Sequence, residues 1–102
     1  MKVYRVVFSP NAENDLLDLA IYIADHSSYE RAMNYIARIE TWCHELGMLP
    51  MRGADRKDIQ PGIRVAGFER RATVAFHFGQ DTVTILRILY GGRNLDAALD
   101  EI

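Results

Sequence analysis

The chain has little of several features that would assign it to a familiar class. It contains one cysteine among 102 residues, so no internal disulfide can form, which is typical of a reducing cytoplasm. It has no run of about 18 apolar residues, which excludes a membrane-spanning helix. Its first ten residues (MKVYRVVFSP) lack the apolar stretch and cleavage site of a secretory signal. We therefore expect one cytoplasmic domain over residues 1–102, away from membranes.

Motifs for metal, nucleotide and serine-nucleophile chemistry are also missing. There is no CxxC, HxxxH or acidic calcium-loop spacing and no GxSxG elbow. Cys43 and His44 are neighbours on a predicted helix, so they project about 100° apart and cannot share one metal ion. The seven glycines are dispersed and build no phosphate-binding loop. We expect no metal and no cofactor, and we interpret Cys43 as a small core residue.

The first half of the chain has the pattern of one strand and two helices. Residues 2–8 are rich in β-branched and aromatic side chains, which predicts a strand. Ser9 precedes a proline and an apolar pattern of helical period, so we expect it to cap a helix over residues 10–25. The spacing of Ser27 and Glu30 is that of a capping box, which predicts that a second helix begins there.

The second half changes to a period of two. Gly47 and Pro50 end the second helix, and residues 51–61 are irregular and polar. Strands are predicted at 62–68, 72–78 and 82–90, followed by a short terminal helix within 95–101. The order is β-α-α-β-β-β-(α), which is typical of an α+β domain whose two helices form an antiparallel hairpin.

Charge is divided unevenly along the chain, although the formal net charge is only −2. Residues 1–51 carry a net charge of −3, residues 52–94 carry +4, and residues 95–102 carry −3. Ten of the twelve basic residues are arginine, the side chain best suited to bidentate contact with carboxylate or phosphate. The basic segment is therefore either a recognition surface or a solvated sheet face.

Five arginines lie on or beside the predicted strands: Arg64, Arg70, Arg71, Arg87 and Arg93. A metal-independent ribonuclease could use such a face, with arginines on the scissile phosphate and a second group moving the proton of the 2′-hydroxyl. His77, which shares a strand face with Arg71, and Tyr90 are the candidates for proton transfer. The alternative is that His77 is a half-exposed strand residue and Tyr90 an aromatic at the edge of the core.

Nearly the whole chain resembles the RelE/ParE superfamily of bacterial toxins from type II toxin–antitoxin modules. The resemblance is carried by VVFSPNAENDLLDLAIYIA, by ELGMLPMRG after the second helix, by IQPGIRVAGFERRATVAFHF and by TILRILYGGRN. It implies a curled antiparallel sheet with an N-terminal helical hairpin packed on it.

The superfamily has two branches with different activities. The RelE-like branch cleaves mRNA on the ribosome with lysines, arginines and a tyrosine near the C-terminus, and Arg71 and Arg93 can be matched to its arginines. However, residues 62–102 contain no lysine, residues 91–102 contain no tyrosine, lysine or histidine, and the acidic tail would repel RNA. The segments SPNAENDL, QPGIR and ILYGGRN resemble the ParE branch, whose members are non-enzymatic poisons of DNA gyrase.

The resemblance also implies a cognate antitoxin. Such antitoxins contact DNA through an N-terminal region and fold a C-terminal segment over the toxin, and an acidic or amphipathic segment would suit the basic region. The five arginines above are therefore candidates for binding the target or the antitoxin. Tyr22, Tyr29, Met33 and Trp42 on the helices are candidate apolar anchors, or else core and ordinary surface. A pure binding domain without toxicity is a third possibility.

Overall fold

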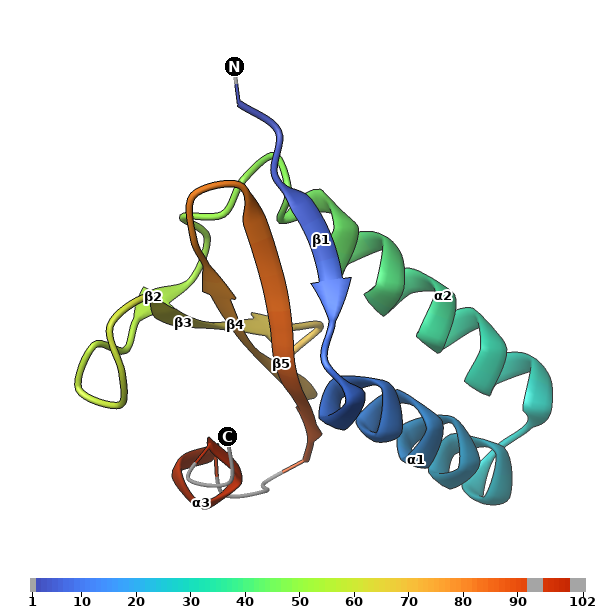
Figure 1. The fold of residues 1–102 in the computed structure, drawn as a ribbon. Coiled ribbons are helices and arrows are strands. Elements are labelled where there is room, and N and C mark those ends of the chain that lie inside the picture. Colours follow the sequence, from blue (N-terminus) through green and yellow to red (C-terminus); the bar gives the residue numbers. More distant parts are fainter. Residues whose placement is uncertain (1, 92–94, 100–102) are drawn as a thin grey trace.

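The computed structural model describes residues 2–91 and 95–99 and has the α+β architecture expected from the sequence (Figure 1). Two long helices follow the first strand, and the remaining strands complete a five-stranded sheet on which the helical hairpin packs. The elements are β1 (Arg5–Phe8), α1 (Pro10–His26), α2 (Tyr29–Glu45), β2 (Ala54–Asp55), β3 (Ile63–Phe68), β4 (Ala72–Phe78), β5 (Thr82–Tyr90) and α3 (Leu95–Leu99).

The helix boundaries follow from their caps. Ser9 accepts a hydrogen bond from the backbone N–H of Ala12 at 3.0 Å, which confirms the predicted start of α1. The second cap is Ser28, which accepts from the N–H of Arg31 at 3.1 Å, and not Ser27 as predicted. The prediction was wrong by one residue because α1 extends through His26 and uses Ser27 as its own C-cap.

The strand order is β1-β5-β4-β3-β2, and three of the four pairings are antiparallel. The exception is β1, which runs parallel to β5 with Arg5 opposite Thr82 and Phe8 opposite Ile85. The predicted antiparallel sheet is thus confirmed for three pairings, and the β1–β5 pair adds a parallel edge to it. The short strand β2, which pairs with β3, lies in the segment predicted to be irregular.

The core lies between the helical hairpin and one face of the sheet. Leu16 and Leu19 of α1, together with Ile39 of α2, pack against Phe76 of β4 and Ile85 of β5. Strand β5 lies between β1 and β4 and is buried along most of its length, as is typical of a strand with a neighbour on each side. Within residues 2–91 and 95–99, no helix is long and apolar enough to cross a membrane.

A β-bulge interrupts the pairing of β4 with β5. Ile85 pairs with Phe76 and Arg87 pairs with Ala75, so Leu86 is an extra residue on β5. A bulge of this kind shifts the alternation of side chains between the two faces of a sheet. As a result, the alternation of half-buried and buried residues that begins at Thr82 gives way to three consecutive buried residues, Arg87 to Leu89.

Candidate functional site

The turn between β3 and β4 carries two of the predicted arginines. The N–H of Arg71 donates to the carbonyl of Phe68 at 3.1 Å, so Glu69 and Arg70 are the central residues of the turn. Their φ angles are 50° and 61°, which matches the two positive φ values of a type I′ hairpin turn. The turn leaves Arg70 exposed, and the carbonyl of Arg71 accepts from the N–H of Gly91 at 2.9 Å. Arg71 is thereby fixed beside the end of β5.

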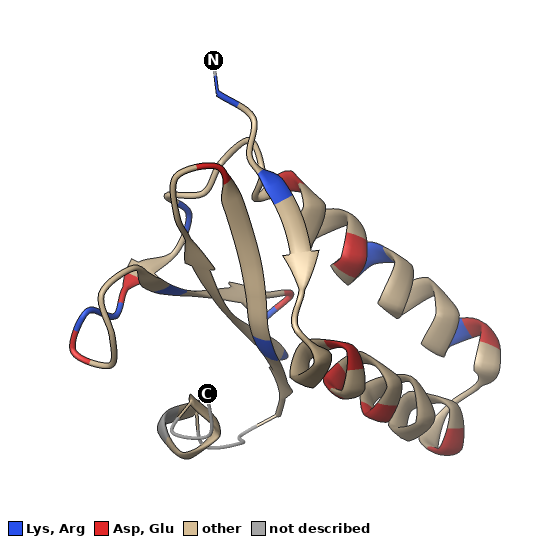
Figure 2. Cartoon of the chain, in the orientation of Figure 1, with Lys and Arg blue, Asp and Glu red and all other residues tan. Residues whose placement is uncertain are grey.

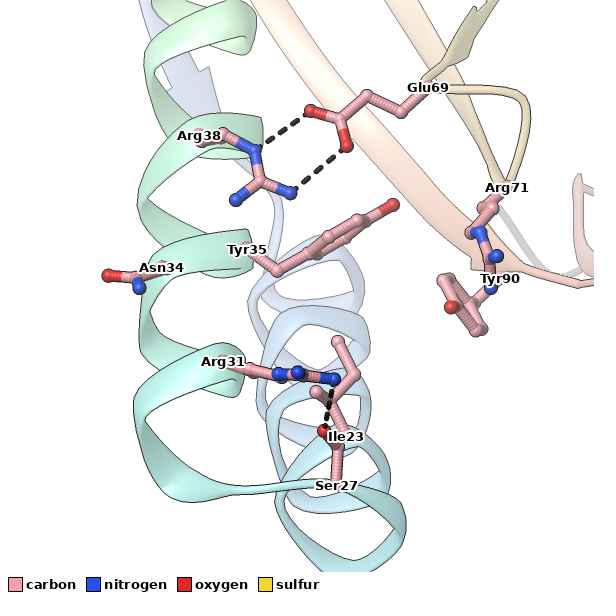
Figure 3. A pocket seen from close by; sticks show the side chains of 9 residues that line it. All are labelled: Ile23, Ser27, Arg31, Asn34, Tyr35, Arg38, Glu69, Arg71 and Tyr90. Atoms are coloured by element: carbon pink, nitrogen blue, oxygen red, sulfur yellow. Dashed lines mark hydrogen bonds and ion pairs between the residues drawn. The ribbon is translucent and has the colours of Figure 1, made fainter.

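A pocket of about 370 Å³ opens between the helical hairpin and this turn (Figure 3). Its polar lining combines three guanidinium groups, one carboxylate and two tyrosines. The lining residues are Ile23, Ser27, Arg31, Asn34, Tyr35, Arg38, Glu69, Arg71 and Tyr90. We refer to it as the arginine pocket.

A bidentate ion pair crosses one side of the arginine pocket. Arg38 donates from Nε to Glu69 Oε2 at 2.9 Å and from Nη2 to Oε1 at 3.0 Å. These hydrogen bonds hold the pKa of Glu69 below its ordinary value. Both side chains are about half exposed, so solvent screens the pair and its main effect is to fix the turn against α2.

Tyr35 forms the floor of the arginine pocket and is only 7% exposed. Its ring packs edge-on against the rings of Phe68 and Tyr90. The guanidinium carbon of Arg38 lies over the Tyr35 ring, 5.3 Å from its centroid. Its hydroxyl is buried and has no hydrogen-bond partner among the described residues. Burial and the nearby Tyr90 raise the pKa of Tyr35 to about 12. The group is therefore a neutral hydroxyl at physiological pH, with a donor hydrogen still available.

Arg71 and Tyr90 adjoin on the far wall of the same pocket, as Figure 3 shows. The interaction with the hydroxyl of Tyr90 raises the pKa of the Arg71 guanidinium. Tyr22 of α1 lies 5.8 Å from Tyr90 between ring centroids and stacks on His26 at 4.2 Å. Two residues chosen from the sequence thus meet in one site, and a half-exposed aromatic ring borders them.

His77 does not join Arg71 and Tyr90. It lies near the opposite end of β4 from Arg71, a separation of about 20 Å at the usual rise per strand residue. Its ring packs against Gly62, where an added Cβ would stand 2.6 Å from His77 Nε2. The three groups postulated for a ribonuclease are therefore not assembled at one place, and Arg93 lies outside the described residues.

Arg64 is engaged within the fold. Its Nη2 donates to the carbonyls of Met51 and Gly53, both at 2.8 Å, and its Nε donates to that of Arg52 at 3.2 Å. The guanidinium thus ties together the loop that follows α2. The prediction of Arg64 as a contact residue must allow for this structural role.

Arg87, a candidate contact residue from the sequence, is buried within the fold. Only 7% of the residue is exposed, and it forms a bidentate ion pair with Asp15 of α1. Its Nη1 also donates to the carbonyl of Ala98 in α3 at 3.2 Å. Arg87 therefore joins β5 to α1 and to α3.

The predicted apolar anchors differ in exposure. Tyr22 and Met33 are substantially exposed, and Tyr29 is 73% exposed. Trp42 is half-buried and packs edge-on against Phe68, with ring centroids 5.8 Å apart. Tyr29 and Met33, four residues apart, share a face of α2 that does not line the arginine pocket.

The cysteine is buried, as predicted. Burial raises the pKa of the Cys43 thiol to about 12, so it is not a thiolate nucleophile at neutral pH. Among the described residues, no three His, Cys, Asp or Glu side chains gather in a way that would hold a metal ion.

The α2 wall of the arginine pocket was not identified from the sequence. Arg31, Tyr35 and Arg38 follow one another at intervals of four and three residues, which places them on one helix face. That spacing was the available signal. It does not reveal that the turn containing Glu69 and Arg71 lies opposite, because this depends on tertiary packing.

Comparisons with known proteins give one consistent result. A family model described as "ParE toxin of type II toxin-antitoxin system, parDE" matches residues 6–95. Toxin ParE3 of Caulobacter vibrioides is 32% identical over 95 residues, which are 93% of this chain and 94% of that protein. A solved structure titled "Chromosomal ParDE TA system from P. aeruginosa" has a similar fold. Its TM-score is 0.75 with 22% identity, over 87% of this chain and 97% of that one.

Proposed function

Because the chain belongs to the ParE toxin family of type II toxin–antitoxin systems, we propose that it is a non-enzymatic toxin that acts on DNA gyrase. We further propose that a cognate antitoxin neutralises it by binding it directly. Gyrase acts on cytoplasmic DNA, so the proposal places the toxin in the cytoplasm.

The main support for a non-enzymatic toxin is that the candidate catalytic groups lie far apart. Efficient cleavage of RNA by the 2′-hydroxyl uses two proton-transfer groups beside the bound phosphate, one that takes the proton of the hydroxyl and one that protonates the leaving oxygen. Arg71 and Tyr90 adjoin, but His77 lies near the other end of β4. This arrangement supports binding by the basic turn more than cleavage.

Exposed apolar side chains on the helical hairpin support the proposal of a bound antitoxin segment. Leu17 and Ile21 are more than half exposed and lie one turn apart on α1. On α2, Tyr29 and Met33 form a second exposed pair. An amphipathic antitoxin segment could bury such side chains, and acidic residues in it would complement the arginines. Contact with DNA would then be made mainly by the antitoxin.

Purified gyrase provides the test of the target. Adding the toxin to gyrase and plasmid DNA should accumulate cleaved DNA, and prior addition of the antitoxin should suppress the effect. Unchanged supercoiling at a large toxin excess would contradict gyrase as the target. New cuts in mRNA during toxin expression would instead support a ribonuclease, and those cuts should then depend on Arg71 and Tyr90.

Growth measurements test the toxin–antitoxin relation itself. Expression of the chain alone should arrest growth, and co-expression of the antitoxin should restore it. A harmless chain would favour the pure binding domain.

A further inference from the structure

We propose that the arginine pocket receives one carboxylate side chain of the antitoxin, an inference that rests on the proposed function. The pocket would hold this group between the guanidiniums of Arg31 and Arg71, with the hydroxyl of Tyr35 donating to it.

The charge of the lining favours an anion. Three guanidiniums face one carboxylate, that of Glu69, so the charged side chains of the pocket carry a net charge of +2. Glu69 already shows how a carboxylate binds in this setting, since it accepts both hydrogen bonds from Arg38 in the planar geometry that suits a guanidinium. A second carboxylate would find Arg31 and Arg71 on the remaining walls (Figure 3).

The hydroxyl of Tyr35 supplies a second and independent indication of a ligand. A buried polar group without a partner is costly, and native proteins rarely leave one unsatisfied. Tyr35 is 7% exposed, lines the pocket and has no partner among the described residues. A bound carboxylate oxygen would accept its hydrogen.

The surroundings favour a protein carboxylate over a nucleic-acid phosphate. Acidic residues lie along α1, as Figure 2 shows, and Asp18 lines the adjoining hollow against Tyr90. A nucleic acid would bring several phosphates past these carboxylates and past Glu69. A peptide would bring a single charge, and its apolar side chains could pack on Tyr22, which is half exposed beside Tyr90.

Calorimetric titration of the antitoxin into toxin variants tests the proposal. Tyr35→Phe and Arg71→Gln should each weaken antitoxin binding about tenfold, because each removes a hydrogen bond to a charged group. The matched control is Arg5→Gln, which loses the same charge on β1, where the exposed side chain does not line the pocket. Its affinity should stay within about twofold of wild type.

Stability of the free toxin separates a binding role from a structural one. Because the hydroxyl of Tyr35 has no described partner, Tyr35→Phe should leave the melting temperature unchanged or higher while the affinity falls. An acid-to-amide scan of the antitoxin segment should identify one carboxylate whose loss weakens binding to wild type but not to Arg71→Gln.

Three results would overturn the proposal in distinguishable ways. Equal affinities for wild type, Tyr35→Phe, Arg71→Gln and the control Arg5→Gln would show that the pocket receives no antitoxin carboxylate. If Tyr35→Phe and Arg71→Gln retained the antitoxin affinity but no longer trapped gyrase-cleaved DNA, the pocket would be assigned to a DNA phosphate. A wild-type chain that neither binds the antitoxin nor arrests growth would refute the proposed function itself.

Discussion

Replacing Asp15 by asparagine should strongly destabilise the fold. The carboxylate accepts hydrogen bonds from Arg87 Nε at 2.8 Å, from Arg87 Nη2 at 3.0 Å and from the N–H of Ile88 at 2.8 Å. The Asp15 and Arg87 side chains are 5% and 8% exposed. A neutral amide would leave the guanidinium buried without its counter-charge. Losing one member of such a buried ion pair costs about 3–5 kcal/mol.

Thermal and urea unfolding followed by circular dichroism would measure this loss. In a domain of about 100 residues, each kcal/mol shifts the melting temperature by about 4–8 °C, so a loss of about 3–5 kcal/mol should lower it by roughly 12–40 °C. Asp18→Asn is the matched control, because Asp18 lies on the same helix and is exposed. Its effect should stay within about 0.5 kcal/mol.

The double substitution Asp15→Leu with Arg87→Met completes the experiment. Removing both charges leaves neither buried unpaired, so the double variant should be more stable than either single variant. The reasoning would be refuted if Asp15→Asn were as stable as Asp18→Asn, or if the two single losses simply added in the double variant.

Glu69→Gln should reduce the acid sensitivity of folding. Arg38 holds the pKa of Glu69 below its ordinary 4.5. The ion pair therefore stabilises the fold above about pH 4.5, and this stabilisation is lost as the pH falls through the lowered pKa. Urea unfolding between about pH 2 and pH 7 would measure the difference between wild type and Glu69→Gln. Burial raises the pKa of Tyr35 from 10.0 to about 12. The stability linked to its neutral hydroxyl is therefore complete below pH 10 and is lost as the pH rises through about 12. The free energy of unfolding of Tyr35→Phe should not show this fall at alkaline pH. Gly53→Ala should lower the melting temperature more than Gly91→Ala. Both residues have positive φ (80° and 70°), which costs an alanine about 1–2 kcal/mol at either position. Only at Gly53 would the new Cβ also collide with the backbone of β3. At Gly91 the new Cβ would meet no described atom within 4 Å. Equal losses would contradict this steric argument.

Local signals in the sequence were sufficient for the helices and for most strands. Ser9 caps α1 as predicted because the cap, the following proline and the helical period all act within a few residues. The adjacency of Arg71 and Tyr90 was also within reach, since a tight hairpin turn and one further strand bring them together.

Features that depend on distant residues were not predictable in the same way. The parallel direction of β1 relative to β5 depends on how the helical hairpin returns the chain to the sheet. The pairing of Asp15 with Arg87 joins residues that are 72 positions apart, and both residue types are usually exposed. The bulge at Leu86 shifts side chains between faces without leaving a local sequence signal.

The pairing of β1 with β5 also sets the time at which a newly made chain can fold. Strand β1 leaves the ribosome first, but its hydrogen-bonding partner β5 is among the last elements to emerge. At about 5–20 residues per second, roughly 4–15 s pass between them. Until then β1 has no strand to pair with, and Asp15 cannot form its ion pair with Arg87. A nascent chain therefore lacks the native surface until β5 has emerged, so an antitoxin that recognises that surface can bind only after β5 has paired with β1.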